Sequence, residues 1–412
     1  MEVAEKKKPK VPKLRFREFE GGWFIVKLKN AAKIQRGRFS PRPRNNPIYY
    51  GGEYPFVQTS DVVNCNGKIE FFSQSLNEKG LAVSKLFPKG TILMTIAANI
   101  GHTGVLQQAM ACPDSLIGIV CNENVHNYFL NFYLSTQQAR LDYLAPEAAQ
   151  KNLNIEFLNP YPVVLTSLPE QKKIADFLSA ADARIQQLNR KKELLETYKK
   201  GVMQKLFSQE LRFKQADGTS YADWEEKRLG EVFERVTRKN KENNQNVLTI
   251  SAQQGLINQE EYFNKSVSAN NVTGYYLLNK GEFAYNKSYS KGYPMGAVKR
   301  LNRYDKGVVS TLYICFRMKT DDVPEYWEQV LDNGGIDNEL KKIAQEGARN
   351  HGLLNLSVVE FFRDIDITRP CKEEQQKIAD FLSSLDKKIG GVSAQIEKTQ
   401  QFKKGLLQQM FV

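Results

Sequence analysis

The sequence predicts an α+β protein with two tandem mixed α/β domains, each followed by a long helix, and the two helices pair as a coiled coil. Three observations support this fold class. One segment of the 412-residue chain recurs at an offset of 204 residues. The recurring segment carries an apolar stripe with heptad spacing, which is typical of helices that pair along their length. Ahead of each copy, short apolar runs alternate with Gly, Pro and Asn clusters, as in strands and turns.

The repeat is clearest between residues 170–207 and 374–411, where 17 of 38 aligned positions are identical. Both copies read EQ, then KIADFLS, and later KKG. At 1.5 Å per residue, each copy predicts a helix roughly 57 Å long. Gly390-Gly391 predicts a local irregularity in the second helix, because each glycine costs roughly 1 kcal/mol relative to alanine. The alternative is a core helix at the edge of each domain.

The repeat divides the chain into five expected segments. Fainter matches extend it into the domains, where Leu14-Arg15-Phe16 corresponds to Leu211-Arg212-Phe213 and Trp23 to Trp224. We expect a basic arm over 1–13, a domain over 14–167, a helix over 168–210, a second domain over 211–370 and a helix over 371–412. Within the domains, the residue patterns predict strands at Tyr54–Val57, Thr91–Ile96 and Leu116–Val120, and helices at Tyr128–Tyr143 and Val323–Leu331.

Charge and composition limit the partners and the compartment. The chain has 59 Lys and Arg against 46 Asp and Glu, a net charge of +13, which favours a polyanionic partner. No apolar run approaches the roughly 20 residues that span a bilayer, and no hydrophobic leader is visible, so we expect a cytoplasmic protein that does not bind membranes. The five cysteines are widely spaced without a C-x-x-C pair, which indicates neither a disulfide framework nor a zinc site.

Catalytic motifs for nucleic-acid chemistry are missing from the sequence. There is no G-x-x-x-x-G-K-[ST] phosphate loop. Pro113-Asp114 resembles the start of a nuclease motif, but no Glu-x-Lys follows it. Asn46-Pro47-Ile48-Tyr49 and Asn159-Pro160-Tyr161 lack the second proline of an amino-methyltransferase motif, and turn formation explains both. The three histidines lie far apart. The sequence therefore predicts a non-catalytic chain without a metal or cofactor of its own.

Two stretches carry concentrated positive charge and suit contacts with DNA. Lys27–Arg44 contains seven basic residues and no acid, and Lys227–Lys241 contains six against two glutamates. Arginine forks match phosphates and guanine edges, and loops broken by proline can enter a groove. The alternative for each residue is a solvated loop. The candidate DNA-binding residues are Arg36, Arg38, Arg42, Arg44, Asn99, Lys151, Arg235, Arg238, Lys239, Lys287, Tyr289 and Lys291.

Taken together, the paired EQ-x-KIADFLS segments, each after a divergent domain that opens with W-x-x-x-x-L, resemble the specificity (S) subunit of type I restriction–modification systems. The resemblance covers essentially the whole chain. It implies two target-recognition domains, each reading one half of a split DNA site, and an antiparallel helix pair that acts as a spacer. It also implies two modification subunits, which bind S-adenosylmethionine and methylate adenine, and restriction subunits with motor and nuclease activities.

The helix start that is identical in both copies suits a duplicated surface that two identical subunits could grip. The candidate partner-binding residues there are Ile174, Phe177, Leu178, Ile378, Phe381 and Leu382. The alternative is that these residues only form the start of each helix and are identical because the segment was duplicated. For the chain as a whole, one rival function is a non-catalytic coiled-coil scaffold or adaptor whose basic surface is incidental. Another is an adenine-methyltransferase fragment, which would need a cofactor site that the sequence lacks.

Overall fold

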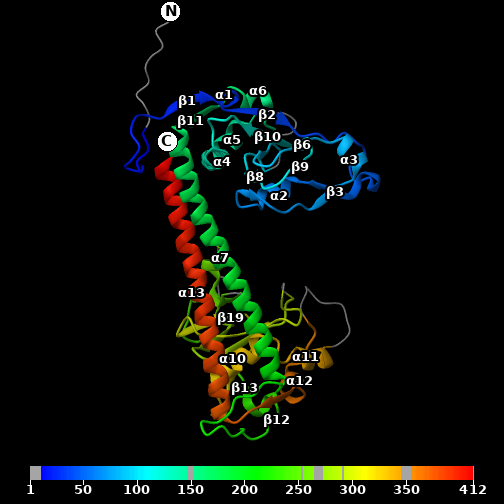
Figure 1. The fold of residues 1–412 in the computed structure, drawn as a ribbon. Coiled ribbons are helices and arrows are strands. Elements are labelled where there is room, and N and C mark those ends of the chain that lie inside the picture. Colours follow the sequence, from blue (N-terminus) through cyan, green and yellow to red (C-terminus); the bar gives the residue numbers. More distant parts are fainter. Residues whose placement is uncertain are drawn as a thin grey trace, which may run out of the picture. The chain divides into compact units, whose positions relative to one another are not determined.

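The computed structural model describes residues 11–97, 99–145, 152–251, 254–263, 272–289, 292–344 and 354–411. The chain forms two compact units. Unit 1 comprises Met1–Lys191 and Val392–Val412, and unit 2 comprises Lys192–Gly391. Each unit therefore contains one mixed α/β domain together with parts of both long helices (Figure 1). Most of the expected N-terminal arm, residues 1–10, lies outside the described residues.

The domain of unit 1 has a five-stranded sheet of order β2-β10-β7-β8-β4, a four-stranded sheet of order β5-β3-β9-β6, and the pair β1-β11. The strands predicted at Tyr54–Val57, Thr91–Ile96 and Leu116–Val120 are β3, β7 and β10. The elements are β1 Phe24–Lys27, α1 Leu28–Ala31, β2 Ala32–Arg36, η1 Pro47–Tyr49, β3 Tyr50–Phe56, α2 Thr59–Val63, β4 Lys68–Ile69, β5 Gln74–Leu76, α3 Glu78–Ala82, β6 Leu86–Phe87, β7 Ile92–Thr95, β8 Thr103–Leu106, β9 Met110–Ala111, β10 Leu116–Cys121, α4 Asn127–Thr136, α5 Gln138–Leu144, α6 Ile155–Leu158 and β11 Pro162–Leu165.

The domain of unit 2 has a four-stranded sheet of order β13-β20-β17-β18 and the pairs β12-β21, β14-β15 and β16-β19. The helix predicted at Val323–Leu331 is α10. The elements are β12 Glu225–Arg228, α8 Leu229–Val232, β13 Phe233–Arg235, β14 Leu248–Ser251, β15 Gly255–Asn258, α9 Gln259–Phe263, β16 Tyr276–Asn279, β17 Phe283–Asn286, β18 Ala297–Arg300, β19 Lys306–Val309, β20 Ile314–Met318, α10 Pro324–Asp332, α11 Asp337–Ile343, α12 Val358–Arg363 and β21 Asp366–Arg369.

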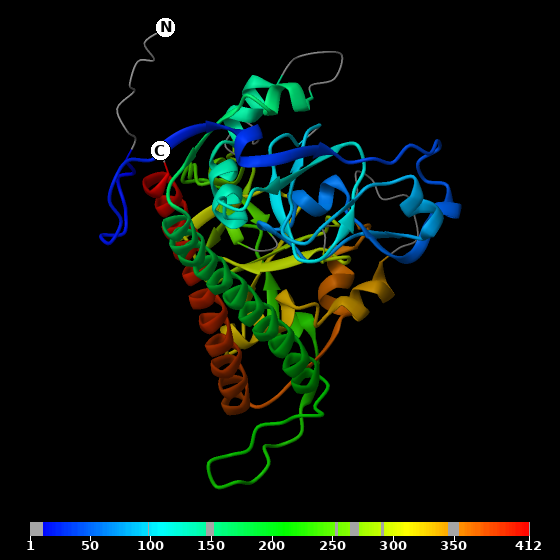
Figure 2. The same cartoon turned by 45° about the horizontal axis from the view of Figure 1, so that its top comes forward.

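The two long helices are α7, Leu168–Phe207, and α13, Lys372–Met410. In unit 1, Asp182 of α7 pairs with Lys403 of α13. In unit 2, Lys199 near the end of α7 pairs with Asp386 near the start of α13, at 2.6 Å. The start of each helix therefore lies beside the end of the other, so the pair is antiparallel (Figures 1 and 2). The predicted fold class is confirmed.

The expected irregularity at Gly390-Gly391 is wrong, because α13 continues through both glycines. Neither glycine would meet another atom within 4 Å if it carried a Cβ, so nothing is wedged into the helix there. Buried Leu385 and Val392 hold the helix on either side. Packing of the apolar stripe therefore outweighs the intrinsic cost of two glycines, roughly 2 kcal/mol.

Two further features concern the chain as a whole. All five cysteines are free thiols, and burial raises the pKa of Cys121 and Cys315 to about 12 in both cases. Among the described helices, none combines the length and the apolar character that crossing a membrane requires.

Candidate nucleic-acid interface

The repeated LRF and EQ motifs meet in both units, where they fasten the domain to a long helix. In unit 1 the Arg15 guanidinium donates from Nε and one Nη to the two carboxylate oxygens of Glu170, at 2.7 and 2.8 Å. In unit 2 Arg212 makes the same pair of bonds to Glu374, at 3.2 and 2.8 Å. Both glutamates are fully buried, and the bonds to Glu170 and Glu374 raise the pKa of their arginines. Bidentate pairing fixes the direction as well as the distance of the contact.

The glutamine of the EQ motif holds a second helix in each domain. The Gln171 carboxamide accepts from the backbone N–H of His126, just before α4, and donates to the carbonyl of Thr166. Gln375 accepts from the N–H of Val323, just before α10, and donates to the carbonyl of Pro370. Helix starts leave backbone N–H groups without partners, so each glutamine satisfies one of them. The EQ motif therefore sets how α4 and α10 sit on the long helices.

In unit 1, three loops leave the same end of the five-stranded sheet. β2 ends at Arg36, which lies opposite Ile117 near the start of β10. β7 also pairs antiparallel with β10, and Thr95 at its end lies opposite Leu116. The loops after β2, after β7 and before β10 are therefore neighbours, and they include residues 37–46, 96–97, 99–102 and 112–115. This end brings together the candidate residues Arg36, Arg38, Arg42, Arg44 and Asn99.

Backbone carbonyls and one acid hold these arginines in place while all four stay exposed. Arg36 donates to the carbonyl of Asp114 at 2.7 Å, and Arg44 binds the Asp114 carboxylate at 2.7 and 3.0 Å. Arg38 donates to the carbonyl of Ser84 at 2.9 Å, and Arg42 donates to carbonyls within its own loop. Each guanidinium has five N–H donors, so donors remain for a ligand. Asp114, whose nuclease role the sequence argued against, is the residue that orients Arg36 and Arg44.

Unit 2 repeats this geometry with different side chains. Arg235 at the end of β13 lies opposite Phe316, and Tyr285 of β17 lies opposite Ile314 at the start of β20. The loops over 236–247 and 310–313, and the segments 287–289 and 292–296, therefore leave the corresponding end of the sheet. The candidates Arg235, Lys287 and Tyr289 lie at this end, whereas Arg238 and Lys239 lie beside β16, where Arg238 reaches Glu282 just before the start of β17. Lys151 and Lys291 lie outside the described residues.

The cations of unit 2 differ in whether they already have hydrogen-bond or ionic partners within the chain. Arg238 forms a bidentate pair with buried Glu282 at 2.9 and 3.2 Å, which raises the pKa of Arg238. Lys239 donates to the carbonyl of Gly274 at 2.8 Å and lies 4.5 Å from the centre of the Tyr276 ring. Arg235 is exposed and has no hydrogen-bond or ionic partner within the described part of the chain. Of these three cations, Arg235 is therefore the most available to a ligand.

Two more candidates and one further residue share this end of the sheet with Arg235. Lys287 is half-buried, and its side chain has no hydrogen-bond or ionic partner in the described ranges. The Tyr289 ring is 58% exposed. Leu312, which the sequence did not single out, is 59% exposed in the 310–313 loop. A single leucine among polar residues gives no pattern to read, although an exposed apolar side chain suits contact with a thymine methyl group.

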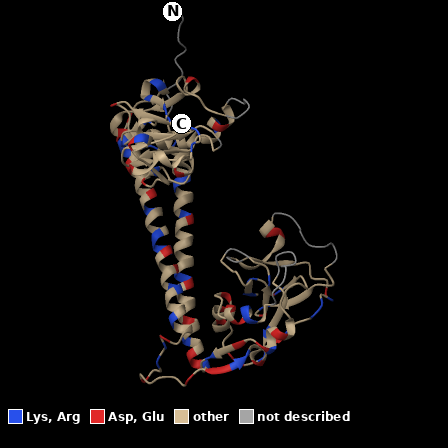
Figure 3. Cartoon of the chain, turned by 90° about the vertical axis from the view of Figure 1, so that its right-hand side faces the viewer, with Lys and Arg blue, Asp and Glu red and all other residues tan. Residues whose placement is uncertain are grey.

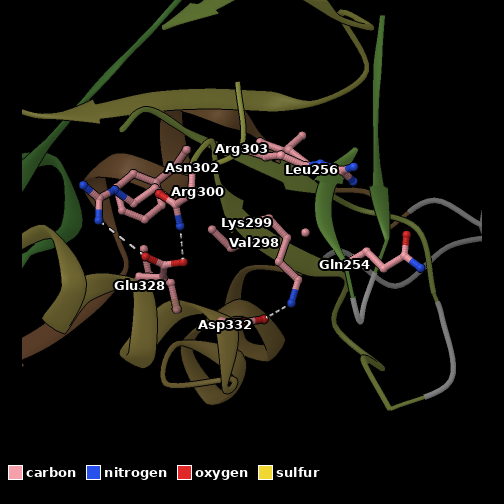
Figure 4. A pocket seen from close by; sticks show the side chains of 12 residues that line it. Gln254, Leu256, Val298, Lys299, Arg300, Asn302, Arg303, Glu328 and Asp332 are labelled. Atoms are coloured by element: carbon pink, nitrogen blue, oxygen red, sulfur yellow. Dashed lines mark hydrogen bonds and ion pairs between the residues drawn. The ribbon is translucent and has the colours of Figure 1, made fainter. Parts of the chain in front are cut away.

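A second group of cations in unit 2 lines a small cavity of about 240 Å³ (Figure 4). Lys299 pairs with Asp332 there, and Arg300 pairs with Glu325 at 2.7 Å and with Glu328 at 3.4 Å. Burial raises the pKa of Glu328. These cations are neutralised by acids of the same unit, so the cavity does not offer a phosphate site.

The candidate partner-binding residues fall into two groups. Ile174, Leu178, Ile378 and Leu382 are at most 1% exposed and belong to the apolar cores of their own units, so they do not form a surface. Phe177 is 39% exposed and packs edge to face on Phe16 at 5.7 Å. Phe381 is half-buried and packs in the same way on Phe213 at 5.8 Å. The surface available to a partner at the helix starts is therefore centred on Phe177 and Phe381.

Elsewhere on the helices, charged residues of both signs alternate along the exposed faces (Figure 3). No three His, Cys, Asp or Glu side chains within the described ranges gather as ligands of a metal ion would.

Comparison with known proteins agrees with the duplicated geometry. The family model described as "Type I restriction modification DNA specificity domain" matches residues 20–197 and again residues 221–399. The chain belongs to this family. The two matches each contain one α/β domain and most of one long helix, so each repeat of the sequence is one copy of the family's domain.

Curated relatives in the same family support the assignment. The chain is 27% identical over 233 residues to the type I restriction enzyme MjaIX specificity subunit of Methanocaldococcus jannaschii, covering 51% of each chain. It is 30% identical over 205 residues to the putative MjaX specificity subunit of that organism, covering 48% of this chain and 45% of the relative. The chain thus spans about half the length of the curated relatives it matches.

Solved structures support the fold. A crystal structure of a type I restriction-modification S subunit from M. genitalium aligns over 98% of this chain and 99% of its own, with a TM-score of 0.58 and 16% identity. A structure describing complex assembly and conformational transition of the type I R-M system aligns over 95% and 97%, with a TM-score of 0.53 and 16% identity. At such identities the likeness concerns the fold alone.

Proposed function

We propose that this chain is the DNA-specificity subunit of a type I restriction–modification complex, that each domain reads one half of a bipartite DNA site, and that the chain itself catalyses no reaction. Its helices set the spacer between the halves and dock two adenine-methyltransferase subunits, which bind S-adenosylmethionine. Restriction subunits complete the assembly. One observation carries the proposal: in both units, cation-bearing loops leave the same end of an equivalent sheet.

The two sets of loops differ in their side chains, which suits two different half-sites. Unit 1 presents arginines fixed by Asp114, whereas unit 2 presents Arg235, Lys287 and Leu312. Base readout depends on which donors and apolar groups reach the groove, while phosphate contacts only position the protein. Equivalent scaffolds with unlike loops therefore fit two readers of different sequences.

The proposal is tested by methylome sequencing of a host that expresses the chain with its methyltransferase subunit. Arg235→Ala is expected to weaken or relax recognition at one half of the methylated site and to leave the other half unchanged. The matched control is Arg363→Ala in α12, which packs on α8 at the other end of the same sheet, because Arg363 is exposed and, among the described residues, pairs only with neighbouring Asp364. If Arg235→Ala altered both halves, or neither, the assignment of one half-site per domain would be wrong.

Binding of the purified chain to duplex DNA across a range of salt adds a second measurement. The logarithm of affinity should fall steeply with the logarithm of salt, and loss of one phosphate contact should reduce the slope by about 0.9. A scaffold with an incidental basic surface is the rival function, and it predicts negligible duplex affinity even at low salt. The same measurement therefore separates the two functions.

The spacer role is tested by length. Inserting residues into α7 between Asp182 and Lys200 should change the number of base pairs between the two methylated halves without changing either half. An unchanged spacer in such a variant would contradict the role of the helices as a ruler.

Docking of two identical subunits is supported by surfaces that recur in both units. Phe177 with Lys173 in unit 1 corresponds to Phe381 with Lys377 in unit 2. Tyr198 in unit 2 and Phe402 in unit 1 are 54% and 57% exposed, and each lies three residues before the glycine of a KKG motif. Exposed aromatic side chains are enriched among the residues that dominate protein interfaces.

A further inference from the structure

Unit 1 contains a cleft that the proposed DNA contacts do not use. Its volume is about 760 Å³, and its walls come from the segment Ser60–Phe71 and from residues of α7 and α13. The α7 wall spans Asp182–Asn189 and the α13 wall spans Gln400–Leu407. All these residues belong to unit 1. The cleft is therefore bounded by the recognition domain on one side and by the paired helices on the other.

The lining combines an apolar strip with a set of available carboxamides. Phe71 is 83% exposed, and Ile185 and Leu407 are half-buried. No carboxamide of the cleft lining has a side-chain hydrogen-bond partner within the described ranges, and all five are exposed: Asn64, Asn66, Gln186, Asn189 and Gln400. A carboxamide both donates and accepts, as does a peptide unit of the backbone. An 83%-exposed phenylalanine beside them leaves a large apolar surface in water.

The charge of the cleft argues against DNA as its occupant. Three acids, Asp61, Glu70 and Asp182, face three lysines, Lys68, Lys403 and Lys404, so the lining is neutral overall. Lys403 is already paired with Asp182. Phosphates require an excess of cations, which the cleft does not have.

The position of the cleft leads to the same conclusion. β4 runs parallel to β8, and Lys68 lies beside Val105. The chain at Phe71 therefore continues away from residues 99–102, which precede β8 at the candidate DNA end. DNA held at that end would not enter this cleft.

We propose that the cleft binds a polypeptide segment of a docked methyltransferase subunit. The segment places one bulky apolar side chain against Phe71, Ile185 and Leu407, and the surrounding carboxamides bond its main chain. This inference rests on the proposed function, in which methyltransferase subunits dock on the chain. Phe71 belongs to unit 1, so the contact strengthens the attachment of one of the two subunits.

The test uses the full chain with its methyltransferase subunit and compares two substitutions of equally exposed side chains. Phe71→Ser removes the aromatic ring from the cleft, whereas Tyr143→Ser removes a ring that is also 83% exposed in unit 1 but lies in α5, outside the cleft. Both side chains are largely in solvent, so neither change should unfold the domain. Titration calorimetry and sedimentation then report the affinity and number of bound methyltransferase copies. A photoreactive phenylalanine analogue at position 71 identifies the molecule that it contacts.

Phe71→Ser is expected to weaken the binding of one of the two methyltransferase copies by about 30-fold or more, the loss typical of an interface anchor. Tyr143→Ser is expected to change the affinity of neither copy by more than about threefold. The photoreactive side chain should cross-link to the methyltransferase. Two unchanged affinities with Phe71→Ser, or a cross-link to DNA, would overturn the inference and leave the proposed function intact. A wild-type chain that binds no methyltransferase copy would instead overturn the proposed function, and the inference with it.

Discussion

The Arg15–Glu170 pair offers the sharpest test of how each domain is fastened to its helix. Replacing Arg15 with alanine leaves the Glu170 carboxylate, whose side chain is 1% exposed, with the Thr166 hydroxyl as its one side-chain donor among the residues that the structure describes. The substitution also frees residues 20 and 21, because Arg15 donates to the backbone carbonyls of Glu20 and Gly21. A buried charge without its partner is the main cost of such a change.

The expected loss of stability in unit 1 is about 3–5 kcal/mol, the range for breaking a buried ion pair from one side. At about 1.4 kcal/mol per factor of ten, this corresponds to amide exchange roughly 150- to 4,000-fold faster in the most protected part of the unit. Arg15→Ala combined with Glu170→Leu removes both charges and should recover much of the loss, because an apolar replacement of both partners is often close to neutral.

Hydrogen exchange followed by mass spectrometry measures both units in one experiment. Peptides from α4 and β7 report on unit 1, and peptides from α10 and β17 serve as an internal control. Glu18→Ala is the matched variant, because the Glu18–Lys173 pair lies nearby at 3.1 Å but is about half exposed on both sides. Its exchange should match the wild type. If the amide exchange rates in unit 1 of Arg15→Ala stayed within about threefold of the wild type, the anchoring role of the pair would be refuted.

Three further expectations follow from contacts within single units. Phe411→Ala should destabilise unit 1 by about 3–5 kcal/mol and shift the fluorescence emission of Trp23 to longer wavelength. The reason is that Phe411 is 8% exposed and its ring lies 6.2 Å from the Trp23 ring and 5.3 Å from the Phe129 ring. Unchanged emission would contradict this packing. Asp182→Lys and Lys403→Asp should each destabilise unit 1, and a double-mutant cycle should show that the double reversal recovers about 1 kcal/mol. The recovery should be incomplete, because Lys403 also lies 5.2 Å from the Phe132 ring. If the two losses of stability were strictly additive in the double variant, the pair would contribute nothing. Burial alone would raise the pKa of Asp322, but hydrogen bonds from Gln375, Arg369 and Thr320 lower this pKa below its ordinary value. Unit 2 should therefore lose the stabilisation that ionised Asp322 provides as the pH falls through the lowered pKa. Urea unfolding across acidic pH should show that Asp322→Asn loses less stability than the wild type over this range.

The parts of the fold that the sequence predicts are those with strong local patterns. The heptad stripe predicts α7 and α13, and runs such as Leu116–Val120 predict buried strands, because burial on one face or on both leaves a regular pattern. The sheet order could not be predicted in this way. β10 pairs with β2, which lies more than 70 residues earlier in the chain, and no local pattern encodes such a partner.

The candidate site is predicted less well, because charge alone does not say where a side chain points or what it already binds. Arg38 and Arg235 look alike in the sequence, yet Arg38 is held by backbone carbonyls and Arg235 has no partner within the described residues. Ile174 and Leu178 appear in a repeated motif, which suggested a repeated surface, but the repetition preserves a buried contact. Asp114 was missed as the residue that orients two arginines because its partners are far away in the sequence.

The contacts also explain why the helices repeat closely while the domains have diverged. Several identical positions of the helices meet another repeated position: Glu170 meets Arg15 as Glu374 meets Arg212, and Asp182 meets Lys403 as Asp386 meets Lys199. A change at one such position breaks a contact whose partner is fixed by the same duplication, so both copies are held to the same residues. The loops at the sheet ends are not bound in this way. Asp114 orients Arg44 in unit 1 and Glu282 holds Arg238 in unit 2, two different solutions on equivalent scaffolds. A protein of this design can change what one domain binds without disturbing the helices that both domains share.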